Sequence, residues 1–345
     1  MQVIEIDGSY LEGGGAILRI ATGLSVITQK PIKIFNIRKG RKKSGLQTQH
    51  LEGLKAAAKL CNAELRGARL GSTEIEFYPK EITEKRLAIN VSTAGSIGLI
   101  LQVLQLACVF SKHEIEIEVK GGASFGKFAP PIPYLQNITL SMLEKTGYKI
   151  ELKTIKDGFY PKGGAQAGIK IYPVKNLLPI ILEEQGNLET IEGISIASEY
   201  LKEREVAERQ EKTARKIIFN SLNISPKIKT EYKETLNPGS GIVLWVKTDK
   251  TIMGSDSIGE LGVRAETVGQ NAADNLIKII KSGATVDNHL ADQLIPFIAL
   301  AGEDSVIKSE SLTKHTETNI WLVKKFLSVD FEIKKDKIYE IACKV

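Results

Sequence analysis

Ile17-Leu-Arg-Ile-Ala-Thr-Gly-Leu-Ser-Val-Ile27 is followed, after Thr-Gln-Lys, by Pro31-Ile-Lys-Ile-Phe-Asn-Ile37. Apolar residues recur at helical spacing in the first segment, whereas they alternate in the second, as in a strand. The same pair occurs twice more, as Leu99–Phe110 with His113–Val119 and as Leu290–Ala301 with Ser305–Lys308. The sequence therefore predicts an α/β unit that is repeated along the chain.

Each pair belongs to a longer predicted unit. The unit opens with a strand, at Val3–Ile6, Arg86–Val91 and Leu178–Leu182. A second amphipathic helix follows the pair, at Gln49–Leu60, Tyr134–Lys145 and Thr318–Leu327. Two strands close the unit: Glu64–Gly67 with Glu74–Tyr78, Lys149–Lys153 with Gly168–Tyr172, and Asp330–Lys334 with Ile338–Ala342. The order β-α-β-α-β-β, three times over, predicts an α/β fold of three repeats whose sheets bury one face against helices.

A long stretch interrupts the third unit after its first strand. Its predicted elements are strand Gly193–Ala197, helix Val206–Leu222, strands Lys227–Tyr232 and Gly241–Lys247, and helix Ala265–Ile280. Asn237-Pro-Gly-Ser-Gly marks a turn between strands. We expect a core of three repeats at residues 1–185 and 281–345, in units at 1–80, 81–175 and 176–185 plus 281–345, and a small inserted α/β domain at residues 186–280.

Composition bounds the class of protein. The 345 residues are 42% hydrophobic and 26% charged, as in soluble globular proteins. No apolar run reaches the ~18–20 residues that cross a bilayer, and residues 1–7 lack the features of a signal peptide. The three cysteines have no paired spacing, which predicts a reduced cytoplasmic setting and argues against a structural zinc site. The net charge of +6 permits a polyanionic partner.

Asp7-Gly-Ser-Tyr-Leu-Glu12-Gly-Gly-Gly15 lies between a predicted strand and a predicted helix. Its glycines allow backbone N–H groups to converge on an anion at the helix N-terminus. The loop lacks the Lys-Ser/Thr of a P-loop and the spacing of a dinucleotide-binding loop. Glu12 would repel a phosphate unless a divalent cation lay between them, which predicts a metal site at Glu12. Arg19, one turn into the helix, adds a cation beside the loop.

Arg38-Lys-Gly-Arg41-Lys-Lys43 is a dense basic run directly after a predicted strand. Most such runs are solvated loops. Here the glycine and the position after the strand favour a loop that binds phosphates through Arg38 and Arg41. A long basic loop also favours a polyanionic substrate over a small metabolite.

Two further helix starts carry candidate ligands. Asn90-Val-Ser-Thr-Ala-Gly95-Ser96-Ile-Gly98 resembles the first glycine loop in its position, and Gln102 lies one turn further on. His289-Leu-Ala-Asp292-Gln293 opens the first helix of the third unit. Asp292 and Gln293 suit a ribose or a base, although Asp292 could equally favour the helix N-terminus.

His315 lies in Ser311-Leu-Thr-Lys-His315-Thr-Glu-Thr-Asn-Ile320, at the start of a predicted helix and beside several hydroxyls and an amide. A lone histidine is usually an ordinary surface or core residue. With an ordinary pKa of ~6.5, however, its neutral imidazole is available as a nucleophile at pH 7. Attack on the α-phosphorus of a nucleotide would give a phosphoramidate that hands the nucleotidyl group on.

Six motifs taken together resemble the RNA 3′-terminal phosphate cyclase family, from Asp7 to about Leu327. They are Asp7-Gly…Glu12-Gly-Gly-Gly15…Leu18-Arg19, Ile37-Arg38-x-Gly40-Arg41-x-x-x-Gly45-Leu46…Gln49-His50, Ser92-x-Ala-Gly95-Ser96, Gly158-Phe-Tyr-Pro-x-Gly-Gly164, Leu290-Ala-Asp-Gln293 and His315-x-x-Thr-Asn319. The resemblance implies three repeats similar to the C-terminal domain of translation initiation factor three, with an insert in the third.

The resemblance also implies an activity. ATP and an RNA 3′-phosphate would give a 2′,3′-cyclic phosphate, AMP and pyrophosphate, through a histidine–AMP intermediate and an RNA-adenylate. His315 matches that histidine, and Glu12 matches the carboxylate that holds Mg²⁺ or Mn²⁺. The positions that match the phosphate-contacting set are Arg19, Arg38, Arg41, Gln49 and Gln102. Those that match the nucleoside pocket are Pro130, His289, Asp292 and Gln293, with His289 where the family commonly has an aromatic residue.

Two other functions compete with this one. Non-catalytic cyclase-like proteins of ribosome biogenesis share the fold but differ at the nucleophile, whereas this chain keeps His315 with Glu12 and Arg19. A phosphate-binding transferase on a similar scaffold would act on a small metabolite. The cyclase interpretation implies ATP and RNA with a 3′-phosphate end as partners, with no membrane. It leaves the oligomeric state and the choice of metal open.

Overall fold

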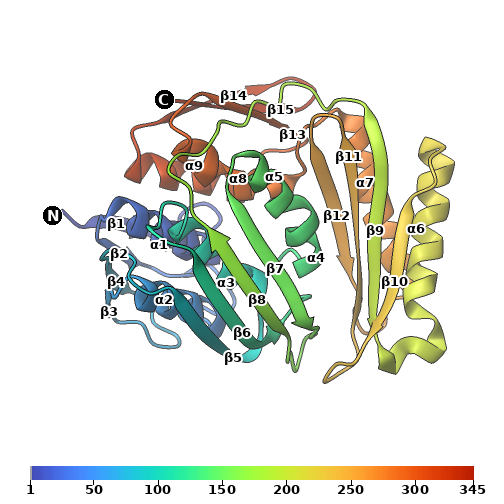
Figure 1. The fold of residues 1–345 in the computed structure, drawn as a ribbon, viewed down its shortest axis with the longest axis horizontal. Coiled ribbons are helices and arrows are strands. Elements are labelled where there is room, and N and C mark those ends of the chain that lie inside the picture. Colours follow the sequence, from blue (N-terminus) through green and yellow to red (C-terminus); the bar gives the residue numbers. More distant parts are fainter. Residues whose placement is uncertain (1) are drawn as a thin grey trace.

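The computed structural model describes residues 2–345, which form four small sheets and the helices that cover them (Figure 1). The first sheet has the strand order β1-β2-β4-β3. Its first two strands are parallel and the other pairs are antiparallel. Its elements are β1 (Ile4–Asp7), α1 (Gly15–Thr28), β2 (Ile32–Phe35), α2 (Thr48–Leu60), β3 (Glu64–Arg66) and β4 (Ile75–Tyr78).

The second sheet has the order β5-β6-β8-β7, again with the first pair parallel and the others antiparallel. Its elements are β5 (Arg86–Ser96), α3 (Ile97–Ala107), β6 (Ile115–Ala123), α4 (Ile132–Tyr134), α5 (Leu140–Lys145), β7 (Lys149–Lys156) and β8 (Gln166–Tyr172). The predicted helix Tyr134–Lys145 is broken, because a π-helical turn at Leu135–Thr139 separates α4 from α5.

The third sheet has the order β13-β15-β14, with both pairs antiparallel. Its elements are α8 (Asn288–Leu300), β13 (Ser305–Ser309), α9 (Lys314–Phe326), β14 (Asp330–Lys335) and β15 (Tyr339–Lys344). The predicted opening strand Leu178–Leu182 is wrong as a strand, since only an isolated parallel bridge joins Ile181 to Val306. Pro179 has no N–H to donate to a ladder, so this edge segment pairs only briefly.

The fourth sheet, order β10-β9-β11-β12, lies within the interrupting stretch. Its elements are β9 (Leu188–Ser198), α6 (Val206–Leu222), β10 (Lys227–Lys233), β11 (Ser240–Thr248), β12 (Ile252–Ile258) and α7 (Ala265–Ser282). β12 was not among the predicted strands. Its sequence, Ile252-Met-Gly-Ser-Asp-Ser-Ile258, has a glycine and three polar residues in its centre and therefore gives a weak strand signal.

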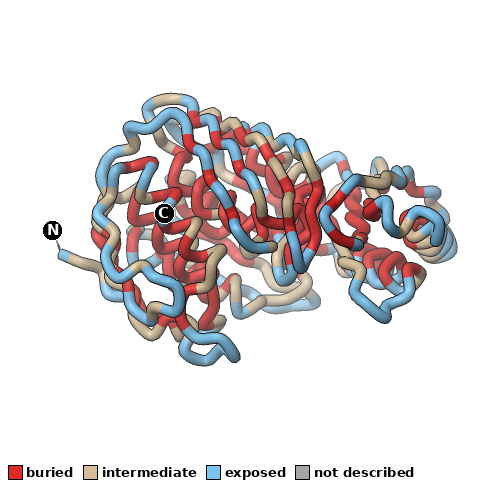
Figure 2. Tube along the Cα trace, turned by 90° about the horizontal axis from the view of Figure 1, so that it is seen from below, coloured by how far each residue is buried: buried red, intermediate tan, exposed pale blue. Residues whose placement is uncertain are grey.

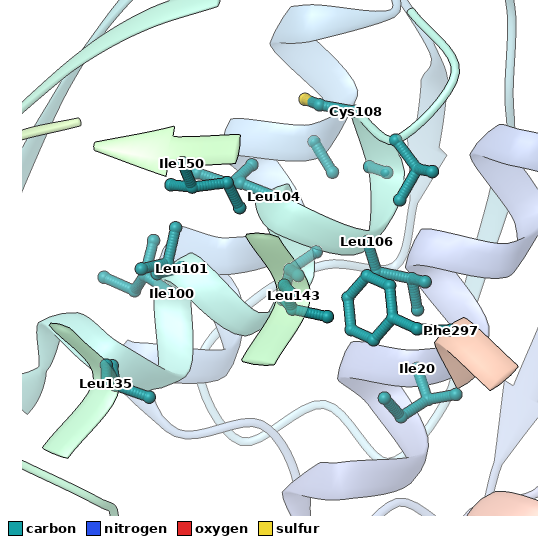
Figure 3. Close-up of a cluster of buried hydrophobic side chains, with 14 of the residues drawn as sticks. Ile20, Ile100, Leu101, Leu104, Leu106, Cys108, Leu135, Leu143, Ile150 and Phe297 are labelled. Carbon is teal, nitrogen blue, oxygen red and sulfur yellow. The ribbon is translucent and has the colours of Figure 1, made fainter. Parts of the chain in front are cut away.

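Two hydrophobic clusters stabilise these parts. The larger one joins the first three sheets, their helices and one face of the fourth sheet, and α1 packs against both α3 and α9 within it. The smaller one lies between the fourth sheet and helices α6 and α7. Figure 2 shows buried residues throughout the interior of both parts, with exposed residues along the outer loops. In the larger cluster, Ile20, Leu106 and Phe297 meet where α1, α3 and α8 converge (Figure 3).

Within residues 2–345, no helix is both long and apolar enough to cross a membrane. Cys61, Cys108 and Cys343 are buried free thiols. Burial raises the pKa of the Cys108 thiol to about 12 and that of Cys343 to about 11, which suits packing rather than reactivity.

Candidate active site

A cavity of about 520 Å³ lies where α1, α3, α8 and the start of α9 meet β12 and α7. Its lining includes Ile20, Leu106 and Phe297, the side chains that meet in the larger hydrophobic cluster. Among the residues predicted from the sequence, the lining contains Arg19, Gln102, Pro130, His289, Asp292, Gln293 and His315. Segments far apart in the sequence therefore contribute to one site. Glu12, Arg38, Arg41 and Gln49 lie outside the lining.

Glu12 is nearly buried in the glycine loop before α1. Its Oε2 accepts a hydrogen bond from the Gly14 N–H at 2.6 Å, and its own N–H donates to Thr318 Oγ1 on α9 at 3.2 Å. A Cβ at Gly14 would lie 2.0 Å from Glu12 Oε1, so only glycine lets the carboxylate fold back onto the loop. Arg41 donates to the Glu12 carbonyl oxygen at 2.7 Å and also pairs with its carboxylate.

His315 lies in the first turn of α9, with its Nε2 3.8 Å from Glu12 Oε1. Its side chain is 45% exposed and lines the cavity, so a ligand can reach the ring. The helix start is fixed by Thr313, whose hydroxyl accepts from the Thr316 N–H at 3.0 Å. Asp292 on α8 accepts hydrogen bonds from the hydroxyls of both threonines. Asp292 thus holds the turn that carries His315, although burial raises the pKa of its carboxyl.

Three guanidinium groups gather beside the glycine loop. Arg19 donates from Nε to Gln102 Oε1 at 2.8 Å, which joins α1 to α3. Desolvation lowers the pKa of Arg19 to about 10, with Glu12 opposing the shift and Arg38 adding to it. Burial and the charge of Arg41 lower the pKa of Arg38 as well. Like charges held together in this way favour an anionic ligand.

His50, which has no predicted role, is buried beside this cluster. Desolvation, followed by the charges of Arg19 and Arg38, lowers the pKa of its imidazole to about 3, so the ring stays neutral. Nδ1 accepts from the Gln47 N–H at 3.2 Å, which assigns the proton to Nε2. Nε2 faces the loop, since a Cβ at Gly15 would lie 2.3 Å from it. The Nε2–H group of His50 is therefore a neutral hydrogen-bond donor at the start of α1.

Gln49 links the first two units. Its Oε1 accepts from the Ser96 N–H at 3.4 Å, directly before α3. Ser96 caps α3 with its own side chain, which accepts from the Leu99 N–H at 3.4 Å. The Ser92–Gly98 segment therefore differs from the first glycine loop, because a side chain already occupies its helix start.

The opposite end of the cavity is built around α8. Asp287 caps this helix through the N–H groups of His289 and Leu290, and it accepts from the Tyr134 hydroxyl at 2.5 Å. The ring of His289 lies edge-on to Tyr134, with centroids 6.1 Å apart, and shares the lining with Pro130. Gln293 is bound by Thr139 at 3.2 Å and donates to the His289 carbonyl at 3.0 Å. These contacts position Gln293 firmly at the cavity wall.

Several lining residues were not predicted. Asp256 and Asn275 come from β12 and α7, while Gln105 and Glu310 come from α3 and the segment after β13. Gln105 Oε1, Glu310 Oε2 and Asn319 Oδ1 are buried without a hydrogen-bond partner in the described part of the chain. Buried polar atoms are usually paired, so these three acceptors are exceptions in the wall of the cavity. Of these residues, only Gln105 could have been found from the sequence, because it is a glutamine on an otherwise apolar helix.

A divalent cation fits this site only with help from a ligand. Among residues 2–345 no group of three or more His, Cys, Asp or Glu side chains could hold a metal. Mg²⁺ commonly takes one or two carboxylates and completes its shell with substrate phosphates and water. Glu12 alone can meet that requirement beside bound phosphates, once its carboxylate is released from Arg41.

The arrangement combines an accessible imidazole, cations and a cavity of about 520 Å³. The imidazole of His315 faces a carboxylate and a cationic end, where phosphoryl oxygens would lie. The flat surfaces of Pro130 and His289 suit a base.

Comparison with known proteins identifies the family of the chain. A sequence profile described as RNA 3′-terminal phosphate cyclase matches residues 10–333. An RNA 3′-terminal phosphate cyclase of Methanopyrus kandleri is 42% identical over 340 residues, covering 97% of this chain and 96% of the relative. Those of Pyrococcus abyssi and Thermococcus kodakarensis are each 43% identical and cover 96% of this chain and 95% of the relative. The family prediction is therefore confirmed: the chain belongs to the RNA 3′-terminal phosphate cyclase family, a family of ligases.

Proposed function

We propose that the protein uses ATP to convert an RNA 3′-terminal phosphate into a 2′,3′-cyclic phosphodiester, with release of AMP and pyrophosphate. The relatives reported above carry the name of this activity. The observation that supports it most directly is the accessible imidazole of His315, 3.8 Å from Glu12 and within one cavity with Arg19 and Gln102.

In the first step, the His315 imidazole attacks the α-phosphorus of ATP. A nitrogen–phosphorus bond forms, the bond to the bridging oxygen breaks, and pyrophosphate leaves as the imidazole proton passes to solvent. Arg19, with Arg38 and Arg41 close by, would offset the charge on the phosphates. Mg²⁺ or Mn²⁺ held by Glu12 would act as a Lewis acid toward the same oxygens.

The later steps return the histidine and use the RNA. An oxygen of the RNA 3′-phosphate attacks the same phosphorus, and the bond to His315 breaks. The neighbouring 2′-hydroxyl then attacks the 3′-phosphorus, loses its proton and displaces AMP. This hydroxyl is adjacent to its target, so the last step needs little beyond positioning. RNA phosphates would bind to the exposed basic loop around Arg41.

We also propose that the first three sheets are repeats of a unit similar to the C-terminal domain of initiation factor three. The shared order of the first two sheets, and the bridge that adds a parallel edge to the third, support this. The separate hydrophobic cluster of the fourth sheet supports an inserted domain at residues 186–280 within a core of residues 1–185 and 281–345. Buried free thiols are consistent with a cytoplasmic protein.

The test is transfer of label from ATP labelled at the α-phosphorus, with Mg²⁺ or Mn²⁺ and without RNA. Wild type should acquire an acid-labile, alkali-stable label, and His315→Ala should acquire none while unfolding at the same temperature. His113→Ala serves as the matched control, because the half-buried His113 lies outside the cavity and its ring has a single hydrogen-bond contact, with the Glu84 carbonyl. A folded wild type that takes no label with either metal would instead favour a non-catalytic RNA-binding relative.

A further inference from the structure

A second cavity, of about 620 Å³, lies where the loop after β6 and the turn before β8 meet the starts of α6 and α7. Phe125 and Phe159, which line it, stack with their ring centroids 5.3 Å apart. The chain at the start of β11 lies directly against these rings. A Cβ at Gly239 would be 2.2 Å from Phe159, and one at Gly241 would be 2.7 Å from Phe125. These close contacts fix the second and fourth sheets against each other, so the second cavity is preformed.

The second cavity adjoins the candidate active site. Ile258 lines both cavities, and the neighbouring residues Lys127 and Phe128 line one each. Phe128 is 99% exposed, so its ring is accessible at the junction. A chain-like ligand whose end lies in the candidate active site can therefore continue into the second cavity.

The lining of the second cavity has an excess of positive charge. Its charged residues are Glu260, Lys127, Arg204, Arg209 and Arg264. Lys127 pairs with Glu260 at 3.0 Å, and Arg209 pairs at 2.7 Å with Glu266, which lies outside the lining. Within residues 2–345, Arg204 and Arg264 form no ion pair, and both are exposed. Two guanidinium groups are therefore available to a ligand.

These two arginines lie at helix starts. Arg204 directly precedes the N-cap of α6, and Arg264 is the N-cap of α7. Neither N-cap residue makes a side-chain cap hydrogen bond. The chain neighbours Glu203 and Glu205 are not in the lining. Guanidinium groups beside helix starts without a side-chain cap favour an anionic ligand.

An exposed aromatic ring lies beside these cations. Tyr160 is 57% exposed, and the Lys127 ammonium group lies 5.2 Å from its ring centroid. Cations and accessible rings together are typical of sites for single-stranded nucleic acid, because phosphates bind the cations and unpaired bases stack on the rings. The basic loop at Arg38–Lys43 has no aromatic residue, so it offers phosphates a site but gives a base no surface. The second cavity meets both requirements.

We propose that the second cavity binds the single-stranded RNA directly upstream of its 3′ end. Arg204 and Arg264 would bind its phosphates, and Tyr160 and Phe128 would stack on its bases. Exposed Leu261 at the rim would also suit a protein partner, but the junction with the candidate active site favours RNA. This inference rests on the proposed function, because it takes the RNA 3′ end to lie in the candidate active site.

Binding without chemistry tests the inference first. In the His315→Ala protein, fluorescence anisotropy measures the affinity for an unstructured RNA of about ten nucleotides with a 3′-phosphate, at several salt concentrations. Adding Arg204→Ala and Arg264→Ala together should weaken binding ~10-fold at physiological salt. The slope of log affinity against log salt should fall by ~1.4, since each phosphate contact of a single strand contributes ~0.7.

Lys212→Ala with Lys216→Ala is the matched control. It removes the same charge from the exposed side of α6, outside both cavities, and should leave the affinity and the slope nearly unchanged. All four substituted side chains are exposed, so both double variants should fold. Equal losses in the two double variants would overturn the proposal, because they would show an effect of general charge. No loss in either would also overturn it and would assign the surface to a protein partner.

The length of the RNA gives a second test, with His315 restored. A dinucleotide with a 3′-phosphate has too little chain upstream to fill the second cavity. The Arg204→Ala, Arg264→Ala variant should therefore raise KM for the longer RNA ~10-fold, while KM for the dinucleotide and self-labelling by ATP stay unchanged. An equal rise in KM for both RNAs would overturn the proposal.

Stacking on Tyr160 is tested with the base removed. Tyr160→Ala should weaken binding of the longer RNA ~10-fold, whereas Tyr160→Phe, which keeps the ring, should bind normally. An RNA whose upstream nucleotides are abasic should bind equally to the protein with and without Tyr160→Ala. A loss that persists with abasic RNA would overturn the stacking, because it would show that Tyr160 acts through the fold.

The outcomes separate the two proposals. RNA binding that depends on Arg204 and Arg264, in a wild type that never becomes labelled, would refute the proposed reaction and keep the inference. Labelling and cyclisation whose KM is independent of both arginines for RNA of every length would refute the inference and keep the reaction.

Discussion

Helices α1 and α8 begin in different ways, although each is the first helix along the chain beside its sheet. Asp287 caps α8 by accepting from two backbone N–H groups at 3.0 Å. The N-cap of α1 is Gly14, which has no side chain to cap the helix. The start of α1 therefore keeps backbone donors for an anion, beside Glu12, Arg19 and the neutral ring of His50. The backbone donors of α8 are thus occupied by a side chain, whereas those of α1 are open to an anion.

Replacing Glu12 tests the α1 side of this comparison most severely. Glu12→Ala should lower self-labelling about a thousandfold, or ~4 kcal/mol, because a metal that offsets phosphate charge would lose its protein ligand. The labelling rate measured across a Mn²⁺ titration should also lose its saturation at low metal concentration. Glu5→Ala, on the exposed side of β1, is the control. An unchanged titration would remove Glu12 from the metal site.

Replacing Asp287 tests the α8 side. Asp287→Ala should lower the free energy of unfolding by ~2–4 kcal/mol, because it removes a cap and leaves the Tyr134 hydroxyl and the Gly254 N–H unpaired in the interior. Denaturant unfolding measures this loss. Asp287→Asn, which keeps one acceptor oxygen, should lose less. A fully stable Asp287→Ala protein would show that α8 does not depend on its cap.

The features that depend on local sequence could be predicted, both for the helices and for the residues at their starts. Glycines before α1 and a histidine near the start of α9 follow from the residue types alone, and most predicted helices lie within a few residues of those observed. Their contact across 303 positions, from Glu12 to His315, came from the family motifs rather than from periodicity.

The missing part of the prediction has a physical cause. Asp256 lies on β12, whose polar centre conceals a strand, and its direction depends on how the fourth sheet faces the core. That orientation is set by packing between Ile252 and the larger cluster and by the Gly254–Asp287 hydrogen bond. Neither contact leaves a local signal. The same holds for residues 178–182, whose pairing at a sheet edge is decided by the neighbouring strand.

Arg41 connects the basic loop to the α1 side. Arg41→Ala should lower the efficiency of self-labelling or of RNA cyclisation by ~10–100-fold, as expected for hydrogen bonds to a charged group. Stability should barely change, since the side chain is 44% exposed. Lys42→Ala, in the same exposed loop, is the control for general charge. Kinetics that match the control would place Arg41 among solvated loop residues.

The smallest effect is expected at α3, which begins like α8. Ser96 accepts from the Leu99 N–H at 3.4 Å, a long hydrogen bond, so Ser96→Ala should cost only ~0.5–1 kcal/mol of unfolding free energy. The backbone N–H of residue 96 can still donate to Gln49 Oε1 after this substitution, so self-labelling per folded molecule should be preserved. Unfolding and labelling measured on one preparation decide the matter. Lost labelling at full stability would mean that the start of α3 also contacts the ligand. Only α8 would then have a start that serves stability alone, while α1 and α3 would both bind the ligand.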